Sequence, residues 1–391
     1  MHCDYSAGIC RGQERSRGRE QGIPETLSLK EDTEIMSKFL SSKYASLEPY
    51  TPGEQPKTQV LTKLNTNESP FPPSPEVVRA VKEAAENLQL YPDPDCTELR
   101  KAIAAVQGVD PDEIICNNGS DETIYFAFLA YCDSGKPAVF PEITYGFYPV
   151  FADITGVKYR EVPLKEDFSI DPEDYYDAEG TVFIANPNAP TGIPLSLDQI
   201  EGILQHNRDN VVVIDEAYVD FGTESAVPLV AKYDNLLVVQ TFSKSRSMAG
   251  MRLGYGIGNK DLIADLNALR FSTNPYNIDR LAIAAGIASL AHDEVNREHC
   301  RAVMENREYT VDELGKMGFE MTPSTANFIF VRHPEIHGSE LFRRLRERGV
   351  IIRHWDKPEL ADYNRITIGS REQMDILLRE VMDILSEEVA K

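Results

Sequence analysis

The stretch VVVIDEAYVDFG at 211–222 and the stretch LLVVQTFSKSRSMAGMRLGYGIG at 236–258 decide the expected fold. Each opens with a short, continuous run of apolar, mostly β-branched residues, which is typical of a strand buried on both faces. Helical spacing separates such runs, as at 196–207, where Ser196 is placed to cap a helix. Further runs of the same kind occupy 136–140, 181–185 and 253–257. Buried strands that alternate with helices predict a large, mostly parallel α/β sheet domain.

The last third of the chain has a different pattern. Helical spacing dominates about 260–317, and strand-like NFIFV (327–331) and RITIG (365–369) then alternate with helical stretches at 339–350 and 371–389. This order predicts a small α+β domain. We expect residues 36–84, which include a helix at 75–88 capped by Ser74, to form an N-terminal arm that joins it. The expected division is therefore a disordered extension at 1–35, the arm at 36–84, a large domain at 85–285 and a small domain at 286–391.

Charge and composition exclude several classes of function. The 391 residues include 40 Lys and Arg against 63 Asp and Glu, a formal net charge of −23. So acidic a surface repels phosphate backbones and anionic lipids, so we expect neither nucleic acid nor membrane as a partner. The six cysteines are scattered without a C-x-x-C pair, which favours reduced thiols in the cytoplasm and offers no metal site.

Candidate ligand-binding residues follow the predicted strands, because ligands bind at the carboxyl ends of strands in open α/β sheets. After the apolar run IIC (114–116) comes NNGSDETI, in which Gly119 permits a tight turn and Ser120 and Asp121 lie where a helix begins. Free backbone N–H groups at a helix N-terminus bind phosphate. The same letters also suit an ordinary helix cap.

Two charged residues end apolar strands further along. Asp215 needs a cation or donors there, since a buried carboxylate is otherwise expensive, although it could simply cap the next turn. Lys244 follows the next strand and is suited to Schiff-base chemistry with an aldehyde cofactor. Ser243 and Arg252 beside it could hold a phosphate. The alternative is a basic surface loop.

Taken together, these elements resemble the histidinol-phosphate aminotransferase family. The matching blocks span about 45 to 385 and are KLNTNESPFPPSP, LYPDPDCTELRKAI, NNGSDETI, TYGFYPVFA, NPNAPTG, VVIDEAYVDFG, TFSKSRSMAGMRLGYGIG and RITIG. The resemblance implies a fold-type I transferase that depends on pyridoxal 5'-phosphate and acts as a homodimer. Its expected substrates are a phosphorylated amino alcohol, histidinol phosphate, and the pair 2-oxoglutarate and glutamate.

The resemblance also implies roles for individual residues. Lys244 would be the catalytic lysine bonded to the cofactor, Asp215 would pair with its ring nitrogen, and Tyr218 would hydrogen-bond its ring hydroxyl. Tyr145 would stack on the ring. The cofactor phosphate would be held by Ser120, Asp121, Ser243 and Arg252, with Tyr91 reaching it from the neighbouring subunit.

For the substrate, the resemblance implies that Arg365 and Arg353 receive the anionic end and that Tyr50 closes over it. One position departs from the family pattern. Ala189 stands where the family usually has an asparagine that touches the ring hydroxyl, and Asn188 or Asn186 could compensate. Aromatic aminotransferases, threonine-phosphate decarboxylases and non-catalytic regulators that bind pyridoxal phosphate share this machinery and remain alternatives.

Overall fold

A computed structural model of the chain describes residues 37–45, 47–56 and 61–389. The chain divides into two compact units, residues 1–46 and 47–391. The described part of the first unit contains a turn of 3-10 helix at Ser42–Tyr44. The predicted disordered extension at 1–35 lies outside the described residues.

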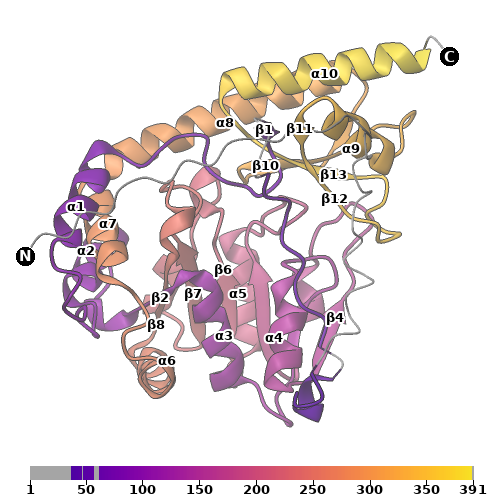
Figure 1. Cartoon of the computed structure of the whole chain (residues 1–391). Helices are drawn as coiled ribbons and strands as arrows, with labels where there is room; N and C mark the ends of the chain where they lie inside the picture. The colour runs from indigo at the N-terminus through magenta and orange to yellow at the C-terminus, as the bar shows by residue number, and fades with distance from the viewer. Residues whose placement is uncertain (1–36, 46, 57–60, 390–391) are drawn as a thin grey trace, which may run out of the picture. The chain divides into compact units, whose positions relative to one another are not determined.

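A seven-stranded sheet forms the centre of the second unit (Figure 1). The strand β8 is antiparallel to both of its neighbours, β2 and β7, and the remaining pairs are parallel. The predicted mostly parallel α/β sheet is therefore confirmed. In spatial order the strands are β2 (Ile114–Asn118), β8 (Leu253–Gly258), β7 (Leu236–Thr241), β6 (Val212–Asp215), β5 (Thr181–Ala185), β3 (Ala138–Pro141) and β4 (Tyr159–Val162).

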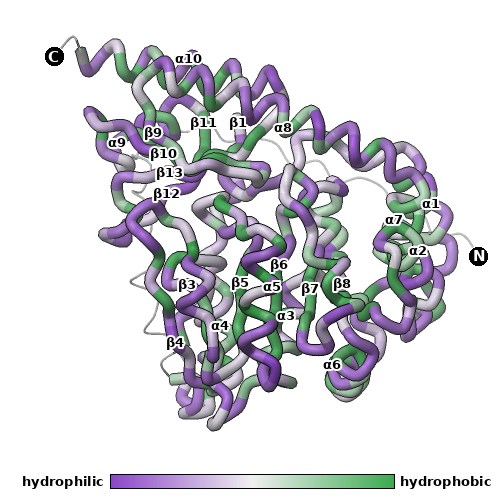
Figure 2. The backbone as a smooth tube through the Cα atoms, turned by 180° about the vertical axis from the view of Figure 1, so that it is seen from behind, coloured by the Kyte–Doolittle hydropathy of each residue, from purple (hydrophilic) through white to green (hydrophobic). Residues whose placement is uncertain are grey.

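Helices cover both faces of this sheet, because successive residues of each strand point to opposite sides. Val182 and Ile184 of β5 join the core on one face, whereas Phe183 joins the core on the other. Figure 2 shows the resulting apolar strands. One face carries α2 (Thr97–Gln107), α5 (Leu197–His206) and α7 (Arg280–Ala291), on which α1 (Pro75–Ala85) packs, and the other carries α3 (Gly119–Tyr131), α4 (Phe147–Thr155) and α6 (Lys260–Thr273).

Most predicted element boundaries lie within three residues of the observed ones. Both predicted caps are present, since the Ser74 hydroxyl accepts from Val77 N and the Ser196 hydroxyl accepts from Gln199 N. The helix predicted at 75–88 ends earlier, at Ala85. Leu88 extends the apolar spacing in sequence but is 61% exposed, so it contributes no core contact that would prolong the helix.

The C-terminal part forms a second, smaller core. Its four-stranded antiparallel sheet has the order β12-β13-β10-β9, and a separate parallel pair joins β1 to β11. This pairing ties residues 62–63 of the N-terminal arm to residues 350–351. The strands are β1 (Thr62–Lys63), β9 (Glu320–Met321), β10 (Phe328–Arg332), β11 (Val350–Ile351), β12 (Arg353–His354) and β13 (Asn364–Thr367), and the helices are α8 (Asp293–Lys316), α9 (Gly338–Glu347) and α10 (Arg371–Val389).

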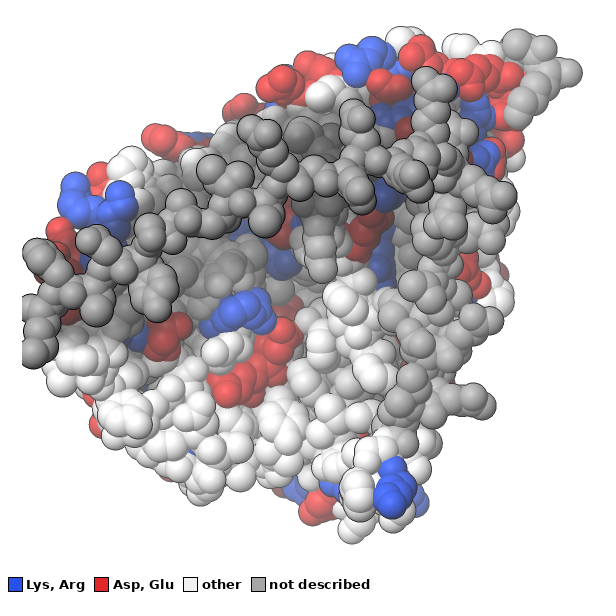
Figure 3. Space-filling model, viewed as in Figure 1, with Lys and Arg blue, Asp and Glu red and all other residues white. Residues whose placement is uncertain are grey.

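The outer faces of the helices of this part carry charges of both signs. Figure 3 shows acidic and basic side chains interspersed along α8 and α10. Arg344 of α9 is buried between Glu387 and Glu388 of α10, and Arg348 binds Glu387 as well. The ion pairs thus join two helices of the small core. None of the helices described here is long and apolar enough to cross a bilayer.

Candidate functional site

The carboxyl ends of the central strands converge on one cavity of about 180 Å³. Asp215 ends β6, Lys244 follows β7, and Ser120 follows β2 at the start of α3. The sheet therefore brings together residues that are more than 100 positions apart in sequence. The lining residues are Thr66, Glu68, Ser120, Asp121, Tyr145, Ala185, Ala189, Asp215, Ala217, Tyr218, Thr241, Ser243, Lys244, Ala249 and Arg252.

Asp215 is a buried carboxylate without an ion-pair partner among the described residues. Its oxygens accept one hydrogen bond from Ala217 N at 3.2 Å and one from the Tyr148 hydroxyl at 3.3 Å. Burial, together with the nearby charge of Asp121, raises the pKa of Asp215 to about 7. A protonated ring nitrogen placed against this carboxylate would supply the missing positive charge.

The opposite end of the cavity is a cradle of backbone N–H groups at the start of α3. Gly119 has φ +78°, a left-handed value that favours glycine. A Cβ on Gly254 would lie 2.3 Å from Ser120 N, so only glycine lets β8 approach the cradle this closely. The first N–H groups of a helix have no partner within the helix and carry the positive end of its dipole, so this end suits an anion.

Asp121 holds two neighbours of the cradle in place. Its Oδ2 is 3.0 Å from Arg252 Nη2, and its Oδ1 accepts the Tyr145 hydroxyl at 2.7 Å. Arg252 has the left-handed φ of +50°, which turns the chain from the lysine loop back into β8. The side chain of Asp121 therefore orients Arg252 and Tyr145.

Lys244 lies between the two ends of the cavity. Its Nζ donates to Thr66 O at 3.2 Å and lies 5.8 Å from the centre of the Tyr218 ring. Ser243, immediately before it, is buried and hydrogen-bonded to the Thr241 hydroxyl. The amine thus faces the cavity from the strand end, near the ring of Tyr218.

A wider cavity of about 500 Å³ adjoins the first. Both are lined by Thr66, Tyr145, Ala189, Tyr218 and Lys244, so the lysine faces both spaces. Tyr50 stacks on Phe147, with ring centroids 4.2 Å apart, at the wall of the wider cavity. The Tyr50 ring also packs against the backbone at Gly146, where a Cβ would be in van der Waals contact with it at 3.4 Å.

Two guanidinium groups face the wider cavity from the small sheet. Arg353 on β12 is directly opposite Arg365 on β13, and each lies 5.4 Å from the centre of the Trp355 ring. Arg365 donates to Asn65 O at 3.1 Å, while its buried Nε has no hydrogen-bond partner among the residues that the structure describes. Burial, with the adjacent charge of Arg353, lowers the pKa of Arg365. An anion between these side chains would compensate both charges.

Two residues expected at the site lie elsewhere in this single chain. Tyr91 is 77% exposed and stacks on Tyr276, away from the cavity of its own chain. The Asn188 side chain accepts from the Thr144 hydroxyl and donates to Ile143 O, and Asn188 does not line either cavity. The remaining expected residues all line one or both cavities.

Sequence reasoning overlooked several residues of the site. Tyr148 contacts Asp215 from α4, the Trp355 ring lies within 5.4 Å of both arginines, and the segment 65–68 forms one wall. For the segment 65–68, the sequence did contain a signal, the N-E-S-P-F block at 67–71. A polar block interrupted by proline contributes little to a hydrophobic core, so its close match to the family pattern indicates a functional role. Tyr148 gave no signal, since it reads as one more aromatic residue of the core.

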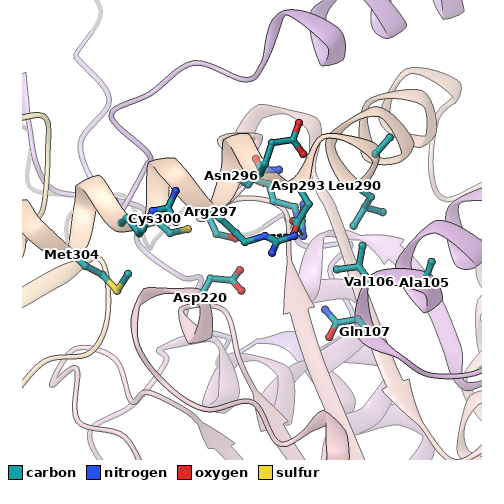
Figure 4. A pocket seen from close by; sticks show the side chains of 15 residues that line it. Ala105, Val106, Gln107, Asp220, Leu290, Asp293, Asn296, Arg297, Cys300 and Met304 are labelled. Carbon is teal, nitrogen blue, oxygen red and sulfur yellow. Dashed lines mark hydrogen bonds and ion pairs between the residues drawn. The ribbon is translucent and has the colours of Figure 1, made fainter.

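A larger hollow of about 770 Å³ lies between α2 and α8, and its buried arginine is already paired (Figure 4). Asp293 Oδ1 is 2.8 Å from Arg246 Nη2, and Asp293 Oδ2 is 2.8 Å from Arg297 Nε. Arg246 also lies over the Phe242 ring. One carboxylate thus contacts two guanidiniums, of which Arg297 is exposed to solvent, and we assign no chemistry to this hollow.

The residues that line the smaller cavity fit pyridoxal phosphate. The buried, unpaired carboxylate of Asp215 suits a protonated ring nitrogen, and the cradle at Gly119 and Ser120 suits the phosphate. Lys244 lies between them, where the aldehyde would stand. Among the described residues no group of three or more histidine, cysteine or carboxylate side chains could hold a metal ion.

Comparison with known proteins agrees with this geometry. The chain is 51% identical over 340 residues to the histidinol-phosphate aminotransferase of Acinetobacter baumannii strain AB307-0294, an alignment that covers 86% of this chain and 94% of that one. It is 47% identical to the enzyme of the same name from Clostridium botulinum strain Langeland over 347 residues, or 88% and 98% of the two chains.

Solved structures show the same fold. The histidinol-phosphate aminotransferase of Clostridium acetobutylicum has a TM-score of 0.76 at 25% identity and covers 83% of this chain and 99% of its own. That of Sinorhizobium meliloti, solved in complex with pyridoxal-5'-phosphate, has a TM-score of 0.81 at 24% identity over 90% and 99%. The family model for aminotransferase class I and II matches residues 59–381. The chain belongs to this family.

Proposed function

We propose that this chain is a pyridoxal-phosphate-dependent aminotransferase that transfers the amino group of histidinol phosphate to 2-oxoglutarate, giving imidazole-acetol phosphate and glutamate. The relatives that carry this name are 46–51% identical to it. The observation that carries the substrate class is the arrangement of Arg353 and Arg365, two guanidiniums that face one cavity beside Lys244.

Each residue of the cavity has a defined task in this proposal. When bound, pyridoxal phosphate supplies an electron sink for the bond between the substrate carbon and its hydrogen. Asp215 holds a proton on the ring nitrogen, which keeps that sink effective. Lys244 Nζ takes the proton from the substrate carbon and returns it. The cradle at Ser120, with Ser243 and Arg252, binds the phosphate.

The wider cavity selects the substrate. Arg365 has no carboxylate partner within the described residues, so a bound anion supplies the charge that the protein itself lacks. Two guanidiniums can each present a bidentate fork, which suits a dianionic phosphate better than a single carboxylate. Tyr50 and Phe147 add an apolar wall that also separates the reacting carbon from water.

The substrate can be identified by half-reactions. The purified, cofactor-loaded enzyme is mixed with a single amine, and the change in its visible spectrum is followed without any acceptor. Histidinol phosphate should convert the enzyme at least about a hundredfold more efficiently than histidinol or histidine, which is roughly 2.7 kcal/mol. Equal efficiency with phenylalanine or tyrosine would identify an aromatic aminotransferase instead. Carbon dioxide released from threonine phosphate would identify a decarboxylase, and no conversion by any amine would indicate a regulator.

We also propose that the working unit is a homodimer. Leu88, Leu90 and Tyr91 are each more than half exposed, and with Tyr276 they line a surface hollow of about 420 Å³. Burying such a group of apolar side chains against a second copy is favourable, and it would let Tyr91 approach the partner's cofactor phosphate. Mixing Lys244→Ala subunits with Tyr91→Phe subunits should then restore one intact site in each heterodimer.

The four described cysteines, Cys96, Cys116, Cys132 and Cys300, are all free and buried. Free thiols are kept in reducing compartments, which supports a cytoplasmic location. Alkylation of unfolded protein taken directly from cells should label these cysteines without prior reduction.

A further inference from the structure

The hydroxyl of Tyr218 has a neighbour that determines which way its proton points. Asn67 Nδ2 lies 3.0 Å from Tyr218 Oη. A tyrosine hydroxyl can donate or accept, but an amide N–H can only donate. The hydroxyl oxygen therefore accepts from Asn67, and its own proton is left for another acceptor. The described residues provide none for this proton, and Tyr218 lines the cofactor cavity.

The orientation of the Asn67 amide is supported by Thr367. Asn67 N donates to Thr367 Oγ1 at 2.9 Å. The Thr367 hydroxyl donates its own proton to Asn67 Oδ1, also at 2.9 Å. With Oδ1 engaged as this acceptor, Nδ2 is the end of the amide that faces Tyr218. The reverse orientation would leave the buried Thr367 hydroxyl proton without an acceptor among the described residues.

The surroundings of Asn67 show that this geometry is held firmly. Asn67 is 1% exposed and Thr367 is 2% exposed, so water does not compete for the bonds. The backbone of Asn67 has φ +54°, a value that asparagine tolerates better than most residues. Its carbonyl accepts from Asn327 Nδ2 at 3.0 Å, which anchors it to the small sheet. The side chain is thus preorganised as a donor.

Other amides near the cavity are committed elsewhere. Asn188 is engaged with Ile143, Thr144 and Thr191, and both ends of the Asn186 amide bind the backbone of Leu195. Ala189 has no amide at the position where the family usually has one. Among the described residues, Asn67 is the one whose amide is bonded to the Tyr218 hydroxyl.

We propose that Asn67 and Thr367 are positioning residues that hold the Tyr218 hydroxyl as a donor toward the ring oxygen of the cofactor. This inference rests on the presence of pyridoxal phosphate in the cavity. Borohydride reduction followed by peptide mapping at Lys244 tests that presence separately. A wrong cofactor assignment can therefore be distinguished from a wrong role for Asn67 and Thr367.

The variant Asn67→Asp tests the direction of the bond. A carboxylate has nearly the same shape as the amide but only accepts, so it would draw the Tyr218 proton away from the cavity. We expect the dissociation constant of pyridoxal phosphate to rise about tenfold. The pH at which the visible band of the bound cofactor changes should also rise, since the ring oxygen loses a donor to its ionised form.

A double-mutant cycle distinguishes an effect of Asn67 that acts through Tyr218 from a general loosening of the N-terminal arm. If Asn67 acts through Tyr218, adding Asn67→Ala to Tyr218→Phe should change the cofactor dissociation constant less than twofold. Thr367→Val should resemble Asn67→Ala, whereas Thr367→Ser, which keeps the hydroxyl, should retain wild-type affinity. Ser69→Ala is the matched control, because Ser69 anchors the same arm to Ser247 and does not contact Tyr218.

Three results would contradict the proposal. Additive losses for Asn67→Ala and Tyr218→Phe would show that the two residues act independently. An equal loss of affinity in Ser69→Ala would show that the arm matters only as a wall. A spectroscopic pH midpoint in Asn67→Asp that matches wild type would show that the direction of the hydrogen bond has no effect on the cofactor.

Discussion

Two regions of this molecule place charged side chains out of water in opposite ways. In the hollow between α2 and α8, the buried guanidinium of Arg246 is paired with Asp293, which also binds the exposed Arg297. In the paired cavities, Asp215 and Arg365 each lack an ion-pair partner among the described residues. Desolvating a charge without a partner is unfavourable, so such groups persist where a ligand supplies the opposite charge. The contrast locates the ligand site better than cavity size does, since the paired hollow is the larger one.

The largest effect is expected when the amine of Lys244, which lines both cavities, is removed. Lys244→Ala should lower kcat by about five orders of magnitude, roughly 7 kcal/mol, because in the proposed mechanism this lysine is both the attachment point of the cofactor and the base. Single-turnover kinetics with histidinol phosphate measures the loss. Lys260→Ala, which only breaks an exposed pair with Asp110, is the control and should stay within twofold of wild type. A loss below tenfold in Lys244→Ala would remove the lysine from the mechanism.

The unpaired carboxylate should leave a signature in the cofactor-free protein. The pKa of Asp215 is raised to about 7 on folding, so the folded state retains a proton that the unfolded state releases. Its contribution therefore lowers stability as the pH rises from about 4 to about 7. Asp215→Asn lacks this titration, and its stability relative to wild type should increase over that window by up to about 4 kcal/mol.

Urea unfolding of both cofactor-free proteins at pH 5, 6, 7 and 8 measures the effect. Asp234→Asn is the control, because Asp234 is exposed and paired with Arg208 at the surface. A stability difference between Asp215→Asn and wild type that stays constant over this range would show that Asp215 is ionised throughout. Asp215 would then no longer support the argument that an unpaired buried charge marks the ligand site.

The unpaired guanidinium should determine discrimination among substrates. Arg365→Met keeps much of the side-chain volume and removes the charge, so the preference for histidinol phosphate over histidinol should fall about a hundredfold in kcat/KM, roughly 2.7 kcal/mol. Arg346→Met is the matched control, since Arg346 binds Glu54 at the surface. If Arg365→Met lowers kcat for both substrates equally, Arg365 supports the site without recognising phosphate.

In the hollow between α2 and α8, by contrast, removing a charge should lower stability and leave catalysis unchanged. Asp293→Asn leaves two guanidiniums without their carboxylate, so we expect unfolding to become easier by about 1–3 kcal/mol while kcat and KM stay within twofold. Denaturant unfolding and steady-state kinetics on the same preparation test both halves. A large change in kcat would mean that the hollow between α2 and α8 communicates with Lys244, which is only two residues from Arg246.

The fold was predictable where a strand is buried on both faces. The apolar runs that end at Asp215 and Thr241 predict buried strands, and β6 and β7 end at those two residues in the structure. The antiparallel placement of β8 between β2 and β7 was not predictable, because strand direction depends on the path of the connecting chain and not on the residues of the strand. Short edge elements such as β4 carry too few apolar residues to be recognised.

The site was predictable where chemistry requires a rare residue at a strand end. Lys244, Asp215 and Arg252 were found because a charge directly after or near an apolar strand is expensive. Asn67 could not be given a role in this way, since its function depends on Thr367 and Tyr218, and no local pattern joins these three. The same holds for Tyr148, whose hydroxyl distinguishes it from a core phenylalanine only once Asp215 is beside it.

The pairing of the arm with the small sheet also affects the order in which the protein matures. Asn67 and Thr367 are 300 residues apart in sequence, and β1 pairs with β11 across a similar interval. Contacts this distant form late, because the entropy of closing so long a loop must be overcome first. A nascent chain that has emerged as far as β8 already holds the phosphate cradle, the lysine and Asp215. The wall formed by residues 65–68 depends on contacts with β13, so we expect firm retention of the cofactor to be acquired only at the end of translation.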